Sequence, residues 1–154
     1  VLITNVDAFR YKFKNFLVET GQNDIKLTPN AEDQVRPVEI PKSWYGVWYP
    51  EYLPEEFYFD FAVERDGIKT IVFKDENDKI IKFSQTPVDG TQIYLDNEGE
   101  QNGNLKIKEQ YDGYWVKNND EIVLTWMQSD LIIELKAELE MDEIKKIANN
   151  LKYF

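Results

Sequence analysis

The chain has 154 residues with no cysteine, no histidine and a formal net charge of −11, and its length fits one domain with its own core. The missing residue types exclude thiol nucleophiles, imidazole bases, disulfides and zinc sites of the usual kind. Residues 41–104 hold thirteen acidic and six basic side chains, a net charge of −7. This balance argues against nucleic-acid binding and against anionic membranes, and it leaves a solvated acidic surface or a cationic partner as interpretations.

The first 43 residues are predicted to form a lead before a domain that spans residues 44–154. The opening "VLI" is too short to cross a bilayer and is either the outer end of a preceding membrane helix or a mature N-terminus. The segment "NVDAFRYKFKNFLVE" fits both a helical stripe and a strand face formed by Phe9, Tyr11 and Phe13. We expect a short helix from about Asn5 and then a strand near Phe16–Glu19. "TGQND" predicts a turn, "IKLT" a short strand, and the proline-rich residues 29–43 a loop.

Aromatic side chains are concentrated in "IPKSWYGVWYPEYLPEEFYFDF", residues 40–61, which also contains three prolines. One interpretation is a packed lid that leads into the first long strand and leaves some rings at the surface. The other is a groove for a ligand or a partner, because an exposed aromatic cluster marks an interaction site. The candidate surface residues are Trp44, Tyr45, Trp48, Tyr49 and Tyr52.

From residue 57 onward the pattern predicts consecutive antiparallel strands. "FYFDFAVE" alternates, which places Phe57, Phe59, Phe61 and Val63 on one face. "RDG" predicts a hairpin turn, followed by strands "IKTIVFK" and "KIIKFSQ" on either side of a "DEND" turn. "QIYLD" predicts a short strand and "NEGEQNGN" a flexible loop. Strands "LKIKEQY" and "YWVKN" are expected on either side of a turn at "DG", and "EIVLTWMQ" and "LIIELKAEL" follow with short connections, which indicates a meander.

The C-terminus predicts a helix, because Ile144, Ile147, Ala148 and Leu151 form one apolar stripe. Such a stripe must cover something, and the open face of the sheet is the natural place. Trp126 is expected in the core against this helix. The predicted fold class is therefore α+β, an antiparallel meander sheet with a C-terminal helix packed on one face.

Three segments together resemble the bacterial family called domain of unknown function 4367. "PEYLPEEFYF" is similar to its proline–aromatic entry, "IVLTWMQSDLIIELKAELEMDEIKKIANNL" to its ending, and "VDAFRYKFKNFLVE" to the lead that often follows a membrane helix in such proteins. Glu56 stands where the family usually has glycine. The resemblance implies an extracytoplasmic domain in Gram-positive bacteria, tethered by an N-terminal membrane helix, with links to anti-sigma regulation or sporulation and a likeness to lipoprotein-carrier folds. It implies no catalytic residues.

The remaining polar motifs do not predict catalysis or metal binding. Glycosidases need two carboxyl groups placed across a cleft, which the neighbouring acids Glu51, Glu55, Glu56 and Asp60 do not ensure. "DENDK" and "DNEGEQNG" lack the spacing of a calcium loop, so solvated turns are the simpler interpretation. Ser43, Ser84 and Ser129 have no histidine and no G-x-S-x-G context. We therefore predict no catalytic, cofactor-binding or metal-binding residues.

Two functions remain open at this stage. One is a non-enzymatic extracytoplasmic sensing or interaction domain of a membrane-anchored protein, whose partner is an unknown protein or cell-envelope ligand. The other is a secreted carrier of a hydrophobic ligand. An apolar cavity between the sheet and the helix favours the carrier, and a filled core counts against it.

Overall fold

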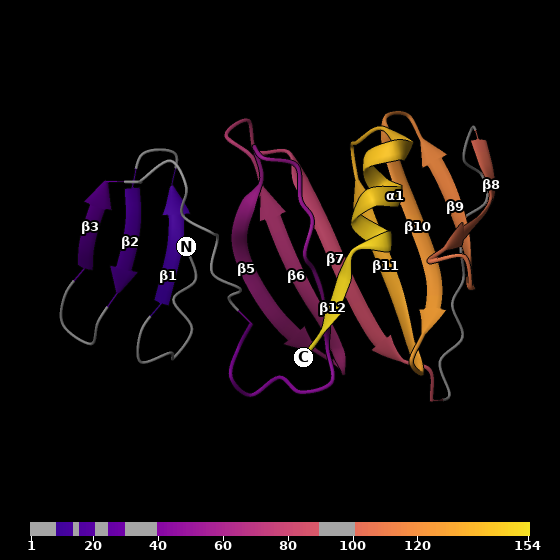
Figure 1. The fold of residues 1–154 in the computed structure, drawn as a ribbon, viewed down its shortest axis with the longest axis horizontal. Helices are drawn as coiled ribbons and strands as arrows, with labels where there is room; N and C mark the ends of the chain where they lie inside the picture. Colours follow the sequence, from indigo (N-terminus) through magenta and orange to yellow (C-terminus); the bar gives the residue numbers. More distant parts are fainter. Residues whose placement is uncertain (1–8, 14–15, 21–24, 30–39, 90–100) are drawn as a thin grey trace.

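The computed structural model describes residues 9–13, 16–20, 25–29, 40–89 and 101–154, the first three stretches by their backbone alone (Figure 1). These three stretches form the antiparallel sheet β1 (Phe9–Phe13), β2 (Phe16–Thr20) and β3 (Ile25–Pro29). The expected helix is therefore wrong over β1, while its predicted start at Asn5 lies outside the described residues. Aromatic side chains in alternation favour a strand, and pairing with β2 satisfies its backbone groups. The strands predicted near Phe16–Glu19 and at "IKLT" are confirmed.

Seven antiparallel strands form the main sheet, in the order β5-β6-β7-β11-β10-β9-β8. Figure 1 shows β5 and β8 at its two edges. The predicted fold class is confirmed, including the hairpin between residues 57–64 and 68–74. The strands are β5 (Tyr58–Arg65), β6 (Ile68–Lys74), β7 (Ile80–Pro87), β8 (Gln101–Ile107), β9 (Tyr111–Asn118), β10 (Glu121–Gln128) and β11 (Leu131–Ala137).

Two meanders, β5 to β7 and β8 to β11, join through the pair β7–β11. After β7 the chain reaches the far edge of the sheet and returns strand by strand, so the last strand lies beside β7. The connection and the strand predicted at "QIYLD" fall in residues 90–100, outside the described residues. The central position of β11 explains why most of its residues are apolar. A strand with neighbours on both sides is covered more fully than an edge strand.

One predicted turn and part of one predicted loop are wrong. "DG" at residues 112–113 lies inside β9, and the chain instead turns at Lys108 and Glu109, whose φ angles are 49° and 60°. Space is tight at Gly113, since a Cβ there would lie 3.0 Å from Cδ1 of Ile107 and 3.1 Å from Cδ1 of Leu124, and these side chains would have to shift. Residues 101–104, expected in a loop, begin β8.

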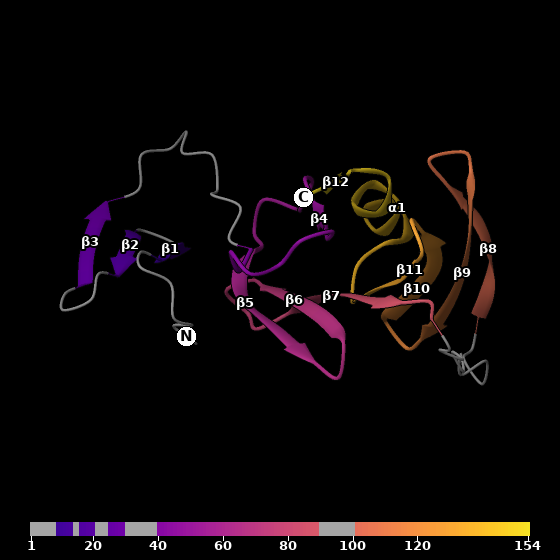
Figure 2. The same cartoon turned by 90° about the horizontal axis from the view of Figure 1, so that it is seen from below.

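A helix and a small two-stranded sheet cover one face of the main sheet (Figure 2). The helix is α1 (Met141–Asn149), and β4 (Trp48–Pro50) pairs with β12 (Leu151–Tyr153). The predicted stripe is confirmed, because Ile144, Ile147, Ala148 and Leu151 are all buried, although Leu151 belongs to β12. Trp126 is 2% exposed and belongs to the same core cluster, as expected. The helix-facing side of the sheet therefore holds the core.

A β-bulge in β5 changes which side chains face that core. The register shifts between Phe59, which pairs with Phe73, and Phe61, which pairs with Val72. One extra residue, Asp60, inverts the alternation of side chains along the rest of the strand. The prediction that Phe61 and Val63 share a face with Phe59 is therefore wrong, because both point to the side of the sheet away from α1.

Candidate functional site

The aromatic segment, residues 40–57, forms a lid beside α1 on the helix side of the sheet (Figure 2). Trp44 and Tyr49 are buried in the core cluster, and Trp48 and Tyr52 are half-buried at its margin. Tyr45 is 82% exposed. The five candidate residues therefore divide between core packing and surface. Their role in binding stays a prediction.

The Trp48 indole contacts two other side chains. The Nζ atom of Lys108 lies 5.2 Å from the ring centroid, and the Tyr153 ring lies 5.0 Å away at an interplanar angle of 56°. The main chain of Trp48 is fixed as well, since Gln85 exchanges two hydrogen bonds with it. These contacts hold Trp48 as part of the packed lid.

A polar contact joins the lid to the helix. The Tyr52 hydroxyl donates to Oε2 of Glu143 over 2.5 Å, and Lys146 donates to Oε1 of the same carboxylate over 3.2 Å. The hydrogen bond from Tyr52, followed by that from Lys146, holds the pKa of Glu143 below its usual value. The same hydrogen bond raises the pKa of Tyr52. These groups lie at the surface, so the contact links the lid to α1. It does not resemble a buried acid–base pair.

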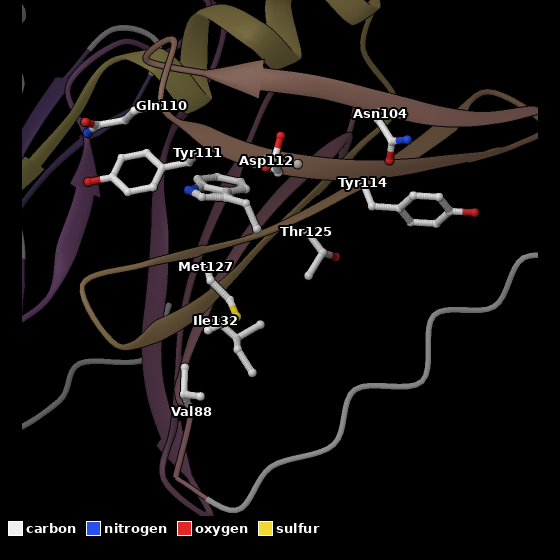
Figure 3. Close-up of a pocket in the computed structure, with 11 residues that line it drawn as sticks. Val88, Asn104, Gln110, Tyr111, Asp112, Tyr114, Thr125, Met127 and Ile132 are labelled. Atoms are coloured by element: carbon white, nitrogen blue, oxygen red, sulfur yellow. The ribbon is translucent and has the colours of Figure 1, made fainter.

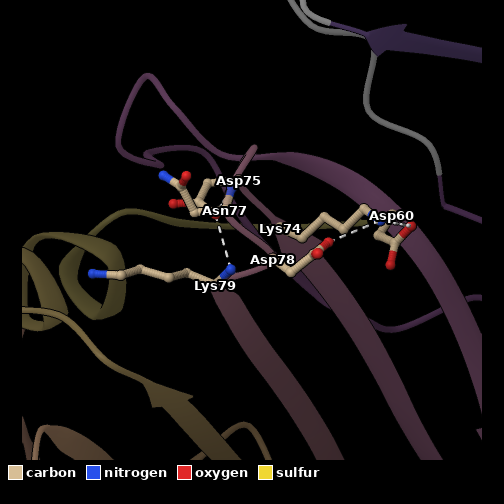
Figure 4. Close-up of polar contacts among 6 residues, drawn as sticks. All are labelled: Asp60, Lys74, Asp75, Asn77, Asp78 and Lys79. Carbon is tan, nitrogen blue, oxygen red and sulfur yellow. Dashed lines mark hydrogen bonds and ion pairs between the residues drawn. The ribbon is translucent and has the colours of Figure 1, made fainter.

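In the acidic turn after β6, the carboxylate of Asp75 accepts hydrogen bonds from the backbone of the turn itself (Figure 4). Oδ1 of Asp75 accepts from the backbone N–H groups of Asn77 and Lys79, each over 2.8 Å. Lys74 lies 4.0 Å from Asp60 and 3.7 Å from Asp78. Within the described ranges no three acidic side chains converge as metal ligands. The absence of a metal or catalytic site stays a prediction.

The side of the main sheet that faces away from α1, which we call the open sheet face, carries several apolar side chains among polar ones. Val72 and Ile132 are buried but lie outside the core cluster, and Val63, Ile68 and Ile80 are 43%, 40% and 53% exposed. These side chains line a hollow of about 650 Å³ over β5, β6, β7 and β11. The bulge at Asp60 places Phe61 and Val63 in this hollow.

A second hollow of about 570 Å³ adjoins the first, and Ile132 lines both (Figure 3). Its walls include Tyr111, Tyr114, Thr125 and Met127. Met127 is 56% exposed, so this hollow is also open to solvent. The two hollows make one trough that crosses the sheet from β5 to β9.

A row of polar side chains crosses the trough at one level. Cross-strand pairing aligns Thr70, Ser84, Glu134, Thr125 and Tyr114 on five successive strands. The hydroxyls of Thr70 and Ser84 are 3.1 Å apart, whereas the buried Thr125 hydroxyl has no hydrogen-bonding partner among the residues that the structure describes. The hydrogen bond of Ser84 is to another hydroxyl, which is not a base that could activate it. This row consists of groups that can form hydrogen bonds.

The charges on the open sheet face are mostly paired. Lys136 lies 3.1 Å from Glu121, and Lys106 lies 2.6 Å from Asp112. Lys82 and Glu134 form no ion pair within the part of the chain that the structure describes. These two residues are diagonal neighbours on β7 and β11, because Lys82 pairs with Lys136 and Ser84 with Glu134. They stand near the centre of the trough.

A family model, described as domain of unknown function (DUF4367), matches residues 47–151. The chain belongs to the DUF4367 family. The matched range of this DUF4367 domain begins within the lid and takes in the main sheet, α1 and the first residue of β12. The sheet of β1 to β3 precedes it. No curated protein matches the sequence.

The family match confirms the resemblance drawn from the two segments at residues 50–59 and 122–151, and it supplies no catalytic residue. The third segment, residues 6–19, lies outside the matched range. The division of the chain between residues 43 and 44 stays a prediction. Among the helical residues that the structure describes, none belongs to a helix with the length and apolarity needed to cross a membrane. Sequence reasoning missed the open sheet face because the bulge at Asp60 has no local signal that separates it from a regular strand.

Proposed function

We propose that this DUF4367 domain is a non-enzymatic interaction domain of a membrane-anchored Gram-positive protein, displayed outside the cytoplasm, where it senses or binds a partner through the open sheet face. One observation carries the proposal. α1, β4 and β12 bury one face of the main sheet, while the other face keeps an aliphatic trough accessible. Exposed apolar surface of this kind marks an interaction site on a protein surface.

The shape of the trough supports a macromolecular partner. A small-molecule pocket usually buries most of its ligand, which requires walls that enclose it. Here Ile80 and Met127 remain about half exposed, so the walls of the trough do not enclose a ligand. A partner with its own apolar surface fits such an open trough better than a small molecule does.

Site-specific photo-crosslinking in the full-length protein, in its host cell, tests the proposal. A photoreactive residue is placed at Ile80 or Met127 on the open sheet face, and at Lys145 on the exposed side of α1 as the matched control. We expect a discrete adduct from the first two positions and none from the third. Equal adducts from all three positions, or no adduct from Ile80 and Met127, contradict the proposed site. Accessibility of Lys145 to a membrane-impermeant amine reagent on intact cells tests the location.

The alternative is a secreted carrier of a hydrophobic ligand. The size of the trough favours it, since about 650 Å³ falls within the roughly 300–1,000 Å³ of small-molecule sites. The position of the trough counts against it, because a filled core of Ile144, Ile147 and Ala148 occupies the space between sheet and helix. Binding of a fluorescent fatty acid at one molecule per chain, abolished by Ile132→Asp, would support the carrier.

A further inference from the structure

Lys82, on the open sheet face, forms no ion pair with any residue that the structure describes. Its directly paired neighbour on β11 is another cation, Lys136. Like charges placed opposite each other destabilise a sheet. Lys136 is neutralised by Glu121 at 3.1 Å, whereas no acidic group lies within ion-pair distance of Lys82 among the described residues. An anion supplied from outside the sheet would relieve this arrangement.

Glu134, two residues before Lys136 on β11, is an acidic residue in the complementary position. Glu134 is a partly buried residue, and its paired neighbours are Ser84 on β7 and Thr125 on β10. No cation in the described ranges forms an ion pair with it. A cation supplied from outside the sheet would give this side chain a counterion.

We propose that the partner on the open sheet face is a second copy of this domain, with Lys82 of each copy against Glu134 of the other. This inference rests on the function proposed above. A two-fold axis generates an isologous contact, in which residue i meets residue j and j meets i. An axis lying between the two faces, perpendicular to the line from Lys82 to Glu134, satisfies both charges at once.

The same axis matches apolar groups. With ordinary spacings of about 4.8 Å between strands and about 6.6 Å between alternate residues, it places Ile132 of one copy over Val72 and Phe61 of the other. Ile80 falls near Thr125 and Met127. The exposed aliphatic side chains of the trough are therefore covered by their symmetry mates.

The size of the face is close to what a stable interface needs. Seven strands of mostly seven or eight residues give it a flat area of roughly 700 Å² at standard strand spacings. A stable interface buries about 800 Å² on each partner, and side-chain relief adds to the flat area. Self-association would therefore bury nearly the whole face.

Charge reversal with reciprocal rescue tests the inference by sedimentation of the 154-residue chain. Wild type is expected to dimerise. Lys82→Glu and Glu134→Lys each place like charges at two contacts, so each variant alone is expected to dimerise about 100-fold more weakly or worse. Mixed in equal amounts, the two variants are expected to form a heterodimer, because both contacts are then complementary. Lys145→Glu on α1 is the matched control and leaves dimerisation unchanged.

The result that overturns the inference is a wild-type chain that stays monomeric up to millimolar concentration, or a mixture that fails to associate although both variants melt as wild type does. The in-cell crosslink from Ile80 separates this failure from failure of the proposed function. An adduct of twice the chain mass supports the second copy. An adduct of another mass keeps the interaction role and refutes the second copy, and absence of any adduct refutes both.

Discussion

The side-chain amide of Gln85 pairs with the main chain of Trp48 as a neighbouring strand would. Its Oε1 accepts from the Trp48 N–H over 2.8 Å, and its Nε2 donates to the Trp48 carbonyl over 3.0 Å. Gln85 is 2% exposed and projects from the core face of β7. One side chain of the main sheet thereby fixes the lid above it.

We expect Gln85→Leu to lower the free energy of unfolding by about 2–4 kcal/mol, because two backbone groups of Trp48 lose their partners. Urea denaturation measures this change. The exposed Gln110→Ala is the control and should change stability by less than about 0.5 kcal/mol. Hydrogen exchange at the Trp48 amide should accelerate in Gln85→Leu. Unchanged exchange there would show that other contacts hold the lid.

The contact between Tyr52 and Glu143 gives the stability a defined pH dependence. The pKa of Glu143 is lowered in the folded state, so its contribution is present above the unfolded pKa of about 4.3 and declines as pH falls through the lower folded value. The pKa of Tyr52 is raised, so its contribution is present below about pH 10 and declines as pH rises through the higher folded value.

Tyr52→Phe should therefore differ from wild type in stability by a constant amount between about pH 5 and pH 9. The difference should shrink in more acidic and more alkaline solution. Urea denaturation across this pH range measures it, with Tyr45→Phe as the control because Tyr45 is 82% exposed. A difference that does not vary from pH 3 to pH 11 would mean that the hydrogen bond does not stabilise the fold.

The bulge at Asp60 predicts unequal roles for two phenylalanines on adjacent strands. Phe73 is fully buried in the core, and Phe61 lies on the open sheet face. Phe73→Ala should cost about 3–5 kcal/mol of stability, as truncations of core aromatics do. Phe61→Ala should cost less than half as much. Equal losses in chemical denaturation would place Phe61 in the core and remove the bulge.

The C-terminal segment is expected to be required for folding. Burial of Ile144, Ile147 and Leu151 contributes roughly 5–9 kcal/mol, at about 1.5–3 kcal/mol for each side chain. This is comparable to the whole stability of a typical domain. A chain ending at Glu140 should be unfolded or aggregated in circular dichroism and light scattering.

A point substitution tests whether the loss of folding comes from lost packing or from the shortened chain. Ile147→Asp should reproduce much of the effect of the truncation, because it places a charge in the core. Lys145→Asp, on the exposed side of the same helix, should leave the melting temperature almost unchanged. Cooperative melting of the truncated chain near the wild-type temperature would contradict the proposed packing.

Local patterns in the sequence determined most of the hairpins and the amphipathic helix. Asp66 and Gly67 have φ angles of 53° and 80° in the predicted "RDG" turn, and Ser129 and Asp130 have 50° and 58° in the short connection predicted between "EIVLTWMQ" and "LIIELKAEL". Turn geometry depends on neighbouring residues, so it can be read from a short stretch. The helical stripe also lies within one stretch of chain, since its spacing alone defines its apolar face.

Long-range contacts were decided only by the tertiary structure. The pairing of β11 with β7, the closure of β4 on β12 and the hydrogen bonds between Gln85 and Trp48 each join residues far apart in the chain. No local propensity encodes such a pairing, because its free energy comes from burial shared by both partners. The bulge at Asp60 belongs to the same class. Its one-residue shift moves Phe61 and Val63 from the expected core to the open sheet face, which is how the candidate site arises.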